Sequence, residues 1–458
     1  MRPAKKGLLE GNILLNMIKF SIPMALMTLL QVLYNTADRV IVGRLLGAGE
    51  LAAVGADGTI INMIVALTVG FGSGASILFG KMVGAKDLSH VKNFVQNAIK
   101  VVVVLGVICT IVSIIIAPYL LVWLNTDSSI IGMATEYLQC YMLGLTFTLL
   151  YSVAGGLLRA CGDNKSPAIS GVVGGLANVI FSLALVLLGM GVLGVAIGTI
   201  LGQLIQSVIL VRCLLRTDRE CRLDFDGFWQ SGTDDILSII KKGLPLGLQS
   251  SLLQISSIYI LSKFVMLADP VNALAGWTAQ SQVDAVFFCV NQALVSTILI
   301  FTSQAVGAGR DDLQGEIAKK GVLASCVLVL TLSAIATCLA QPLVGVFNSD
   351  PAVISYGERV VYTIVPFYVT FALSESVGAV IKGSGDTMTP FIFSLFSILL
   401  SRILLIEIFL PMWTEIEMIG ITYPISWGLN ALCGLAYLIV KKYRSSKNKN
   451  IKKINQNA

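Results

Sequence analysis

Four acidic residues stand out within long apolar stretches of the chain, where an ionisable side chain is expensive to keep. On insertion scales, a charged group at the centre of a membrane helix costs about 2.5–3.5 kcal/mol, so such a group is usually retained for a use or for a partner. A carboxylate held there can take up a proton, a small cation or a charged substrate. The four candidates are Asp38, Asp284, Glu375 and Glu407.

Asp38 is the first of these acids along the chain. It follows Phe20 by 18 residues, which is about 27 Å along a helix that rises 1.5 Å per residue. Tyr34 and Asn35 precede it by four and three residues and therefore share its helical face. A carboxylate beside a phenol and an amide could bind Na⁺, a proton or a cationic substrate. The alternative is an interfacial carboxylate that caps the helix beside Arg39, and spacing alone leaves both open.

Asp284 lies in the middle of an apolar stretch, among amides and aromatic rings. Negative charge, amides and ring faces together suit an organic cation, which is attracted both by the charge and by the face of a ring. A polar patch buried between helices is the alternative. The neighbouring side chains are Gln280, Gln282, Phe287, Phe288, Asn291 and Gln292.

The other two acids have basic residues nearby in the sequence. Glu375 precedes Lys382 by seven residues, so a structural acid neutralised by this lysine is an alternative to a functional one. Glu407 follows Arg402 and lies near the end of its stretch, which favours an ion pair or an interfacial anchor.

Motifs that would indicate an enzyme are absent from the sequence. The single histidine is His90, and no HExxH, Walker A, GxSxG or paired-carboxylate magnesium motif occurs. The 9 cysteines are scattered and form no CxxC. We therefore expect no catalysis, no metal site and no cofactor. Because an ATP-binding domain is also lacking, any pumping must draw on an ion gradient.

The stretches that carry these acids are predicted to be membrane-spanning helices. The sequence is 55% hydrophobic and 13% charged, whereas soluble domains are about 25% charged. Apolar runs of about 20 residues are long enough to cross a bilayer as helices, and their continuity argues against a barrel. We predict an all-α polytopic membrane protein with twelve spans, over 20–42, 51–80, 91–121, 137–158, 168–190, 192–215, 244–266, 271–305, 321–346, 360–381, 391–412 and 419–440.

Loops of the first half recur 223 positions later. The matching segments are Val83-Gly84-Ala85 with Val306-Gly307-Ala308, Asn125-Thr126-Asp127 with Asn348-Ser349-Asp350, and Arg159…Gly162-Asp163…Pro167 with Lys382…Gly385-Asp386…Pro390. Six spans in each repeat is an even number, so both repeats enter the membrane from the same side and are parallel repeats. Pro23 and Pro245 are predicted to open the first span of each repeat.

The repeats predict two lobes, residues 1–215 and 236–441. They are joined by a charged linker, 216–235, and followed by a basic tail, 442–458. Lysine and arginine predominate in alternate connections, which places both termini in the cytoplasm. The net charge of +6 is then a signal of topology. Basic residues interleaved with aromatic ones on a soluble face are absent, so we expect the lipid bilayer, and no nucleic acid, as a partner.

The segment Leu33–Gly55, LYNTADRVIVGRLLGAGELAAVG, resembles the multidrug and toxic compound extrusion (MATE) family. The likeness continues through the repeated loops and covers nearly the whole chain. It implies a V-shaped transporter of two six-helix lobes that exchanges lipophilic organic cations for Na⁺ or H⁺. We accordingly expect a multidrug efflux antiporter, a monomer in the bacterial inner (plasma) membrane, with no cofactor besides the coupling ion.

The resemblance also implies an ion-coupling site in the first repeat. Asp38 matches the acidic residue of the family's first span, and Tyr34 matches the tyrosine one turn before it. Asn178 and Thr199 match polar positions that line the same cavity. Ser182 stands where family members often carry an acid, which leaves Asp38 as the only clear carboxylate of this site.

Substrate binding is expected in the second repeat. Gln254 lies where some family members carry an acid in the seventh span, so Asp284 and Glu375 would have to supply the negative charge. The expected substrate-binding residues are Asp284, Glu375, Gln254, Gln282, Phe287 and Phe288. A lipid-linked oligosaccharide or lipid flippase with the same two-lobe plan is the alternative function. Such a site should favour arginine and lysine, whereas the spans of this chain carry mainly acids.

Overall fold

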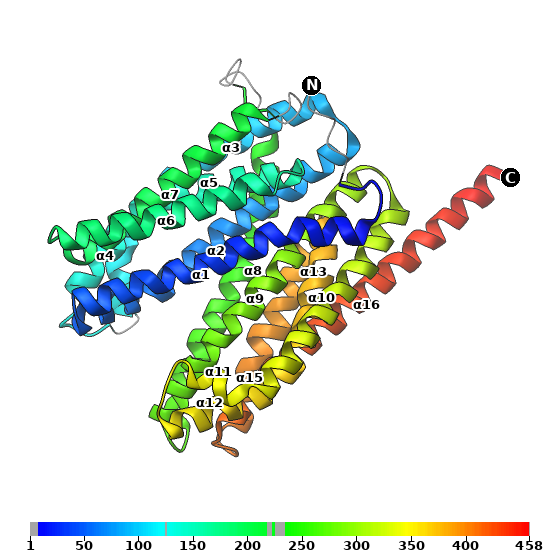
Figure 1. Cartoon of the computed structure of the whole chain (residues 1–458). Coiled ribbons are helices and arrows are strands. Elements are labelled where there is room, and N and C mark those ends of the chain that lie inside the picture. Colours follow the sequence, from blue (N-terminus) through cyan, green and yellow to red (C-terminus); the bar gives the residue numbers. More distant parts are fainter. Residues whose placement is uncertain (1–7, 124–125, 218–221, 225–233, 458) are drawn as a thin grey trace. The chain divides into compact units, whose positions relative to one another are not determined.

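The computed structural model describes residues 8–123, 126–217, 222–224 and 234–457, and every regular element in these ranges is a helix (Figure 1). The first repeat contains α1 (Ile13–Leu45), α2 (Ala48–Ala85), α3 (Leu88–Trp123), α4 (Ile131–Leu143), α5 (Leu145–Ala160), α6 (Lys165–Leu187) and α7 (Gly191–Arg216). The second contains α8 (Asp234–Ser262), α9 (Pro270–Gly307), α10 (Asp311–Cys338), α11 (Ala340–Gly345), α12 (Pro351–Ile364), α13 (Tyr368–Gly383), α14 (Met388–Ser394), α15 (Ser401–Phe409) and α16 (Ile416–Asn457). Short 3₁₀ helices cover Phe264–Met266 and Val365–Phe367, and a π-helical segment, Leu395–Leu400, joins α14 to α15.

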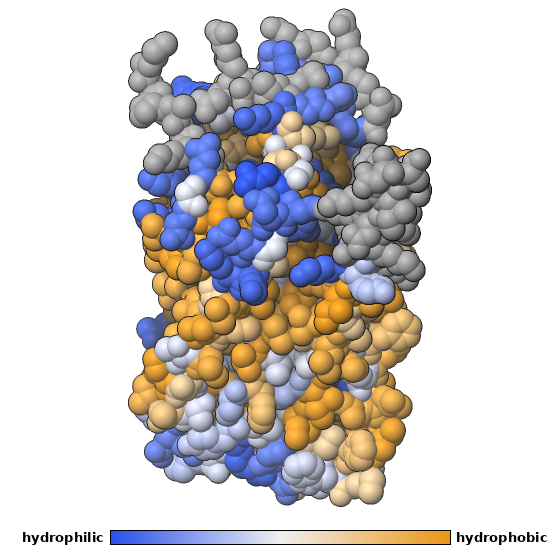
Figure 2. All heavy atoms as spheres, turned by 90° about the vertical axis from the view of Figure 1, so that its right-hand side faces the viewer, coloured by the Kyte–Doolittle hydropathy of each residue, from blue (hydrophilic) through white to orange (hydrophobic). Residues whose placement is uncertain are grey.

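The membrane-spanning character predicted from the sequence is confirmed. In the described residues, 11 helical stretches are long and apolar enough to cross a membrane. A twelfth span is the pair α4 and α5, which bends by 41° at Gly144. Apolar side chains cover the middle of the face shown in Figure 2, and hydrophilic ones gather toward both ends. This is the distribution expected of helices that contact lipid.

The helices begin earlier than the apolar stretches do. Asn12 caps α1, because its side-chain oxygen accepts a hydrogen bond from the backbone N–H of Leu15 at 3.2 Å. Pro23 and Pro245 consequently lie inside α1 and α8 and not in their first turns, so the prediction that they open these spans was wrong. Both helices therefore extend before the predicted spans, α1 from Ile13 and α8 from Asp234.

The chain divides into two compact units. Unit 1 comprises Met1–Ile255 and Phe288–Ile317, and unit 2 comprises Ser256–Phe287 and Ala318–Ala458. Within unit 1, α6 packs along α7, α2 along α5 and α1 along α6. Within unit 2, α16 packs against α12, α13 and α15. The helices α8, α9 and α10 contribute residues to both units, so the units do not coincide with the two sequence repeats.

Glycines allow α2 and α8 to approach closely within unit 1. A Cβ atom added to Gly70 would lie 2.1 Å from the backbone nitrogen of Gly247, and one added to Gly74 would lie 2.6 Å from the Cα atom of Gly243. Small residues permit such contact between membrane helices. Any side chain at these four positions would push the two backbones apart.

Candidate functional site

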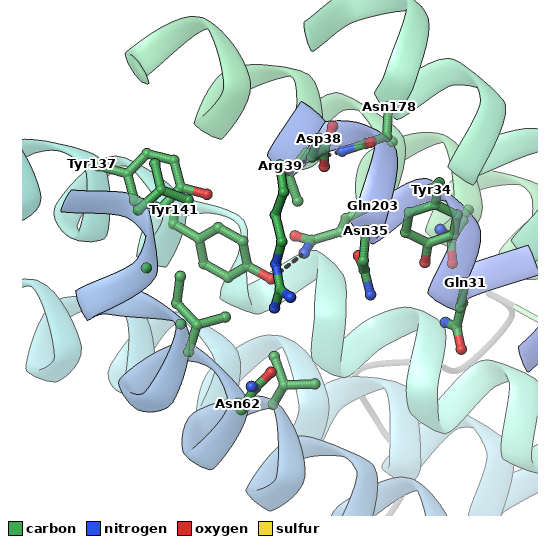
Figure 3. Close-up of a pocket in the computed structure, with 18 of the residues that line it drawn as sticks. Gln31, Tyr34, Asn35, Asp38, Arg39, Asn62, Tyr137, Tyr141, Asn178 and Gln203 are labelled. Carbon is green, nitrogen blue, oxygen red and sulfur yellow. Dashed lines mark hydrogen bonds between the residues drawn. The ribbon is translucent and has the colours of Figure 1, made fainter. Parts of the chain in front are cut away.

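A cavity of about 350 Å³ lies within unit 1 (Figure 3). It is lined by residues of α1, α2, α4, α5, α6 and α7. The four residues that the sequence analysis assigned to ion coupling, Tyr34, Asp38, Asn178 and Thr199, all line this one cavity. The spacing of Tyr34 and Asp38 on α1 brings both to the same face, as expected for residues four apart in a helix.

Asp38 is half-buried at the wall of the cavity. Its Oδ1 atom is inaccessible to solvent and has no hydrogen-bond partner among the described residues. Asn178 and Ser182 of α6 lie beside the carboxyl group. Since α1 continues to Leu45, the alternative in which Asp38 caps the end of this helix was wrong. The carboxylate therefore has the capacity to accept a proton or a cation.

Asn178 links α6 to α7 at the same place. Its side-chain N–H donates to the hydroxyl oxygen of Thr199 at 2.9 Å, and that hydroxyl donates to the backbone oxygen of Val195 at 3.0 Å. The side-chain oxygen of Asn178 is buried and has no partner in the described part of the chain. Two unpartnered oxygens, one on Asp38 and one on Asn178, thus belong to the same wall of the cavity.

Arg39 gives the cavity a positive group as well. In Figure 3 its side chain extends into the cavity, toward Tyr141 and Gln203. The sequence analysis named Arg39 only as the neighbour of an interfacial Asp38 and not as a lining residue. The remaining polar lining consists of Gln31, Asn35, Asn62, Tyr137, Tyr141, Tyr151, Gln203 and Gln206. Tyrosine rings and amides around one acid and one guanidinium can bind a small aromatic molecule in a defined orientation.

Asp284 lies in a closed cluster of unit 2. Its Oδ1 atom accepts hydrogen bonds from Gln280 at 2.5 Å and from the hydroxyl of Tyr368. The ring of Phe287 meets that of Tyr368 edge-on, with ring centroids 5.2 Å apart. The ring of Trp427 also meets that of Tyr368 edge-on, with ring centroids 5.7 Å apart. Acid, amide and aromatic side chains are brought together as predicted. They contact one another, however, which also fits the alternative of a buried polar patch.

Arg402 and Glu407 do not pair with each other. Glu407 forms an ion pair with Lys263 at 2.5 Å and accepts a hydrogen bond from Tyr259. Arg402 is only 2% exposed, and its guanidinium lies 3.9 Å from the centre of the Tyr423 ring. It also donates to the hydroxyl of Ser426 at 2.8 Å. An ion pair at Glu407 is therefore confirmed, but its partner is a lysine in the turn between α8 and the 3₁₀ helix Phe264–Met266.

The other residues predicted for substrate binding are divided between the two units. Gln254 and Phe288 belong to unit 1, whereas Gln282, Phe287 and Glu375 belong to unit 2 with Asp284. The carboxylate of Glu375 lies 3.9 Å from the ammonium group of Lys382, and both side chains are mostly buried. This pair fits the structural alternative stated for Glu375.

Asp57 is a buried acid that the sequence reasoning missed. It lies in α2, and its side chain is 0% exposed. The signal that could have found it is the one used for the other four acids, since Asp57 lies inside the predicted span 51–80.

The MatE family model matches residues 23–184 and, a second time, residues 245–406. The chain belongs to the MatE family. The double match covers both repeats and confirms the resemblance found at Leu33–Gly55. The protein is therefore a multi-pass membrane transporter of the MATE multidrug efflux family.

Individual MATE relatives are distant in sequence but similar along most of their length. The chain is 24% identical over 434 residues to "Probable multidrug resistance protein YoeA" of Bacillus subtilis (strain 168), covering 92% of each chain. It is 26% identical over 369 residues to "FAD transporter" of Shewanella oneidensis, covering 77% of this chain and 78% of that one. Its fold matches a solved structure described as the outward-facing conformation of a multidrug resistance MATE family transporter, with a TM-score of 0.88, 23% identity and coverage of 96% and 98%.

Proposed function

We propose that this MATE protein is an ion-coupled antiporter that exports lipophilic, cationic small molecules in exchange for H⁺ or Na⁺. The observation that carries the proposal is the carboxylate of Asp38, which has an unpartnered oxygen at the wall of a cavity of about 350 Å³. A cavity of this size accommodates a drug-sized molecule. The names of the relatives do not favour the flippase alternative.

In the proposed cycle, the coupling ion and the substrate compete for the negative charge of Asp38. While Asp38 is ionised, it attracts a cationic substrate into the cavity. Proton or Na⁺ binding from the external side neutralises the carboxylate, so the substrate loses its counter-charge and leaves. Exchange of one such ion for one monovalent cation moves no net charge, so the concentration gradient of the coupling ion drives this export. Each further positive charge that moves inward across 100 mV would add about 2.3 kcal/mol.

The remaining assignments of the proposal concern the second repeat and the setting of the protein. Asp284 would supply a further negative charge for the substrate once its hydrogen bonds to Gln280 and Tyr368 are exchanged. The protein would act as a monomer in the plasma membrane, with both termini in the cytoplasm, as the distribution of lysine and arginine between its loops indicates.

Efflux from preloaded cells tests the proposal. Cells expressing the wild type or Asp38→Asn at equal levels would be loaded with a fluorescent lipophilic cation, with and without Na⁺ and with a protonophore. Glu136→Gln is the matched control, because it removes an exposed carboxylate of α4 that does not line the cavity. We expect export by the wild type and by the control, and none by Asp38→Asn. Export by Asp38→Asn at the wild-type rate would contradict the proposed role of Asp38.

Arg39 supports a second candidate substrate. Its guanidinium points into the cavity, and one relative is named an FAD transporter. Guanidinium groups bind phosphate well, so a phosphate-bearing flavin is the alternative cargo. Membrane vesicles carrying wild-type protein or Arg39→Gln would be assayed for transport of FAD and of the fluorescent cation. FAD transport that is lost in Arg39→Gln, without cation transport by the wild type, would favour the flavin.

A further inference from the structure

Asp57 of α2 is a buried acid that the proposed mechanism does not use. Both of its carboxylate oxygens are inaccessible to solvent, and neither has a hydrogen-bond partner among the described residues. None of the ion pairs found in the described part of the chain includes it. Asp57 differs in this respect from Asp284, which accepts two hydrogen bonds, and from Glu375, which has a lysine nearby.

The surroundings of Asp57 are apolar. Ala53 and Ile60 lie four residues before and three residues after it, and so share its face of α2. Both belong to a packed cluster with residues of α3 and α4. The buried members of this cluster are Ala53, Ile60, Ala117, Leu121, Ala134, Leu138 and Met142.

The titratable groups of α4 are Tyr137, Cys140, Tyr141 and the exposed Glu136. From α1, Asp38 and Arg39 line the cavity. The residues that α3 contributes to the cluster are apolar. Tyr137 is close enough to interact electrostatically with both Asp38 and Asp57, and it lines the cavity. Tyr137 is therefore within electrostatic range of both carboxyl groups.

A carboxylate in this setting is stable only when it carries a proton. Burial in apolar packing without a donor or a counter-ion disfavours the charged form. Cations of the hard class need several oxygen ligands, and no group of three or more histidine, cysteine or acidic side chains that could hold a metal ion occurs in the described residues. A proton is the one ion that a lone carboxylate can bind by itself.

We propose that Asp57 is a second proton-binding site of the first repeat, and that it exchanges its proton with water when α2 repacks during transport. The same helix carries Val54, Gly58 and Ile61, which line the cavity. Movement of α2 that opens or narrows the cavity therefore also changes the packing around Asp57. The carboxyl group is protonated in the conformation described here and loses its proton once water reaches it. The exchange step rests on the proposed antiport, whereas the protonated state does not.

Infrared spectroscopy of the full chain in lipid tests the protonated state directly. A protonated carboxyl group has a carbonyl stretch that a carboxylate lacks. The wild-type spectrum at neutral pH, minus that of Asp57→Asn, should contain this band, and Asp57→Glu should restore it. The carboxylate band in its place would overturn the proposal. This result does not depend on whether the protein transports anything.

If Asp57→Asn does not fold, labelling of the wild type replaces the difference spectrum. Dicyclohexylcarbodiimide reacts with protonated carboxyl groups in apolar surroundings, and mass spectrometry of the peptides locates the adduct. We expect an adduct on Asp57 at neutral pH that diminishes at alkaline pH. Labelling of Asp38 or Asp284 without labelling of Asp57 would count against the proposal.

The exchange step is tested by counting protons when substrate binds. Tetraphenylphosphonium binding would be measured by calorimetry in buffers of different ionisation enthalpy. We expect about two protons released per ligand by the wild type and about one by Asp57→Asn, since each linked group contributes its change in bound protons. An unchanged count in Asp57→Asn would remove Asp57 from the exchange. Failure of the wild type to bind this cation would contradict the proposed substrate class and leave the infrared result for Asp57 standing.

Discussion

Each of the two units holds a carboxylate among its helices, but the surroundings of the two groups differ. In unit 1, Asp38 lies at the wall of an open cavity with an unpartnered oxygen. In unit 2, Asp284 accepts hydrogen bonds from Gln280 and Tyr368 and is enclosed by aromatic rings. The two repeats share a fold but not a site: one carboxylate is available to a ligand, and the other is already satisfied by its neighbours.

The repeat register reveals a second difference, which concerns Asp57. Gln280 stands 223 positions after Asp57, so a buried acid in the first repeat corresponds to a buried amide in the second. The acid of the second repeat lies one turn later, at Asp284, where Gln280 can donate to it. Moving the carboxylate by one turn converts an unpartnered acid into a hydrogen-bonded pair. Duplicated helices can therefore keep their packing while their ion chemistry diverges.

The largest expected effect is a difference in dye export between variants of Asp38 and Asp284. Asp38→Asn should lower dye export by at least about tenfold, equivalent to about 1.4 kcal/mol in the transport barrier. Asp284→Asn should lower it by only about threefold, because the amide still accepts a hydrogen bond from Tyr368. Initial efflux rates at matched protein levels provide the measurement. A larger loss in Asp284→Asn than in Asp38→Asn would reverse the comparison.

Glycine packing gives the next effect. A Cβ atom on Gly175 would lie 2.3 Å from Cδ1 of Tyr34, so Gly175→Ala must displace this ring at the cavity wall. Overpacking of this kind costs about 1–3 kcal/mol. In unit 2, Gly378→Ala places its Cβ atom at an ordinary 3.7 Å from Lys382 and should be neutral or slightly stabilising. The unfolding temperatures of the two variants in detergent would be compared with that of the wild type. Equal midpoints for Gly175→Ala and Gly378→Ala would contradict the expected difference in packing.

A smaller effect concerns the tyrosine hydroxyls. Tyr368→Phe removes a donor to the buried carboxylate of Asp284 and should lower the free energy of unfolding by about 1–2 kcal/mol. Its counterpart is Tyr141→Phe, which removes only an acceptor that Gln203 reaches at 3.4 Å in the cavity. That change should cost less than about 0.5 kcal/mol. Denaturant unfolding of both variants measures the two free energies of unfolding. A greater decrease for Tyr141→Phe would show that the hydroxyl in the cavity of unit 1 contributes more to stability than the one beside Asp284.

The smallest effect compares equivalent loops at low pH. Asp163 accepts hydrogen bonds from Lys165 and Ser166 of its own loop, whereas Asp386 accepts from Thr389 and also from Tyr437 of α16, at 2.7 Å. Partial burial raises the pKa of Asp386, but the hydrogen bonds from Thr389 and Tyr437 outweigh it and hold the pKa below its usual value.

The sign of the pH effect follows from that lowered pKa. Stability contributed by the ionised Asp386 is present above its unfolded pKa of about 3.9 and is lost as pH falls through the folded pKa. Unfolding midpoints measured from neutral pH down to about pH 3 should therefore fall less steeply in Asp386→Asn than in the wild type. The Tyr437→Phe variant should lie between them. Parallel curves for all three proteins would exclude this contribution.

The sequence predicted the helices and the residues of the cavity of unit 1 better than it predicted which side chains pair between helices. Long apolar stretches are visible in one dimension, and the spacing of Tyr34 and Asp38 fixes a shared face. The partner of Glu407 is Lys263, which lies 144 positions earlier, and no local pattern signals such a pair. The position of Asp57 inside a predicted span is visible in the sequence, but its lack of a partner depends on the side chains that α3 and α4 place around it. The spacing of residues along a helix predicts which side chains share one face of it. Which side chains meet between two helices depends on how each helix is rotated about its axis, and tertiary packing determines that rotation.

Assembly of the chain during synthesis must wait for the contact of α2 with α8. The residues of α2 that touch Gly243 and Gly247 are made about 170 positions before their partners, and chains grow at about 5–20 residues per second. A half-length ancestor that ended after α7 would have lacked α8 altogether. It could complete this packing only by borrowing the first helix of a second copy, because α8 is the repeat of α1. Fusing the two genes would have turned that obligate encounter between chains into an intramolecular step.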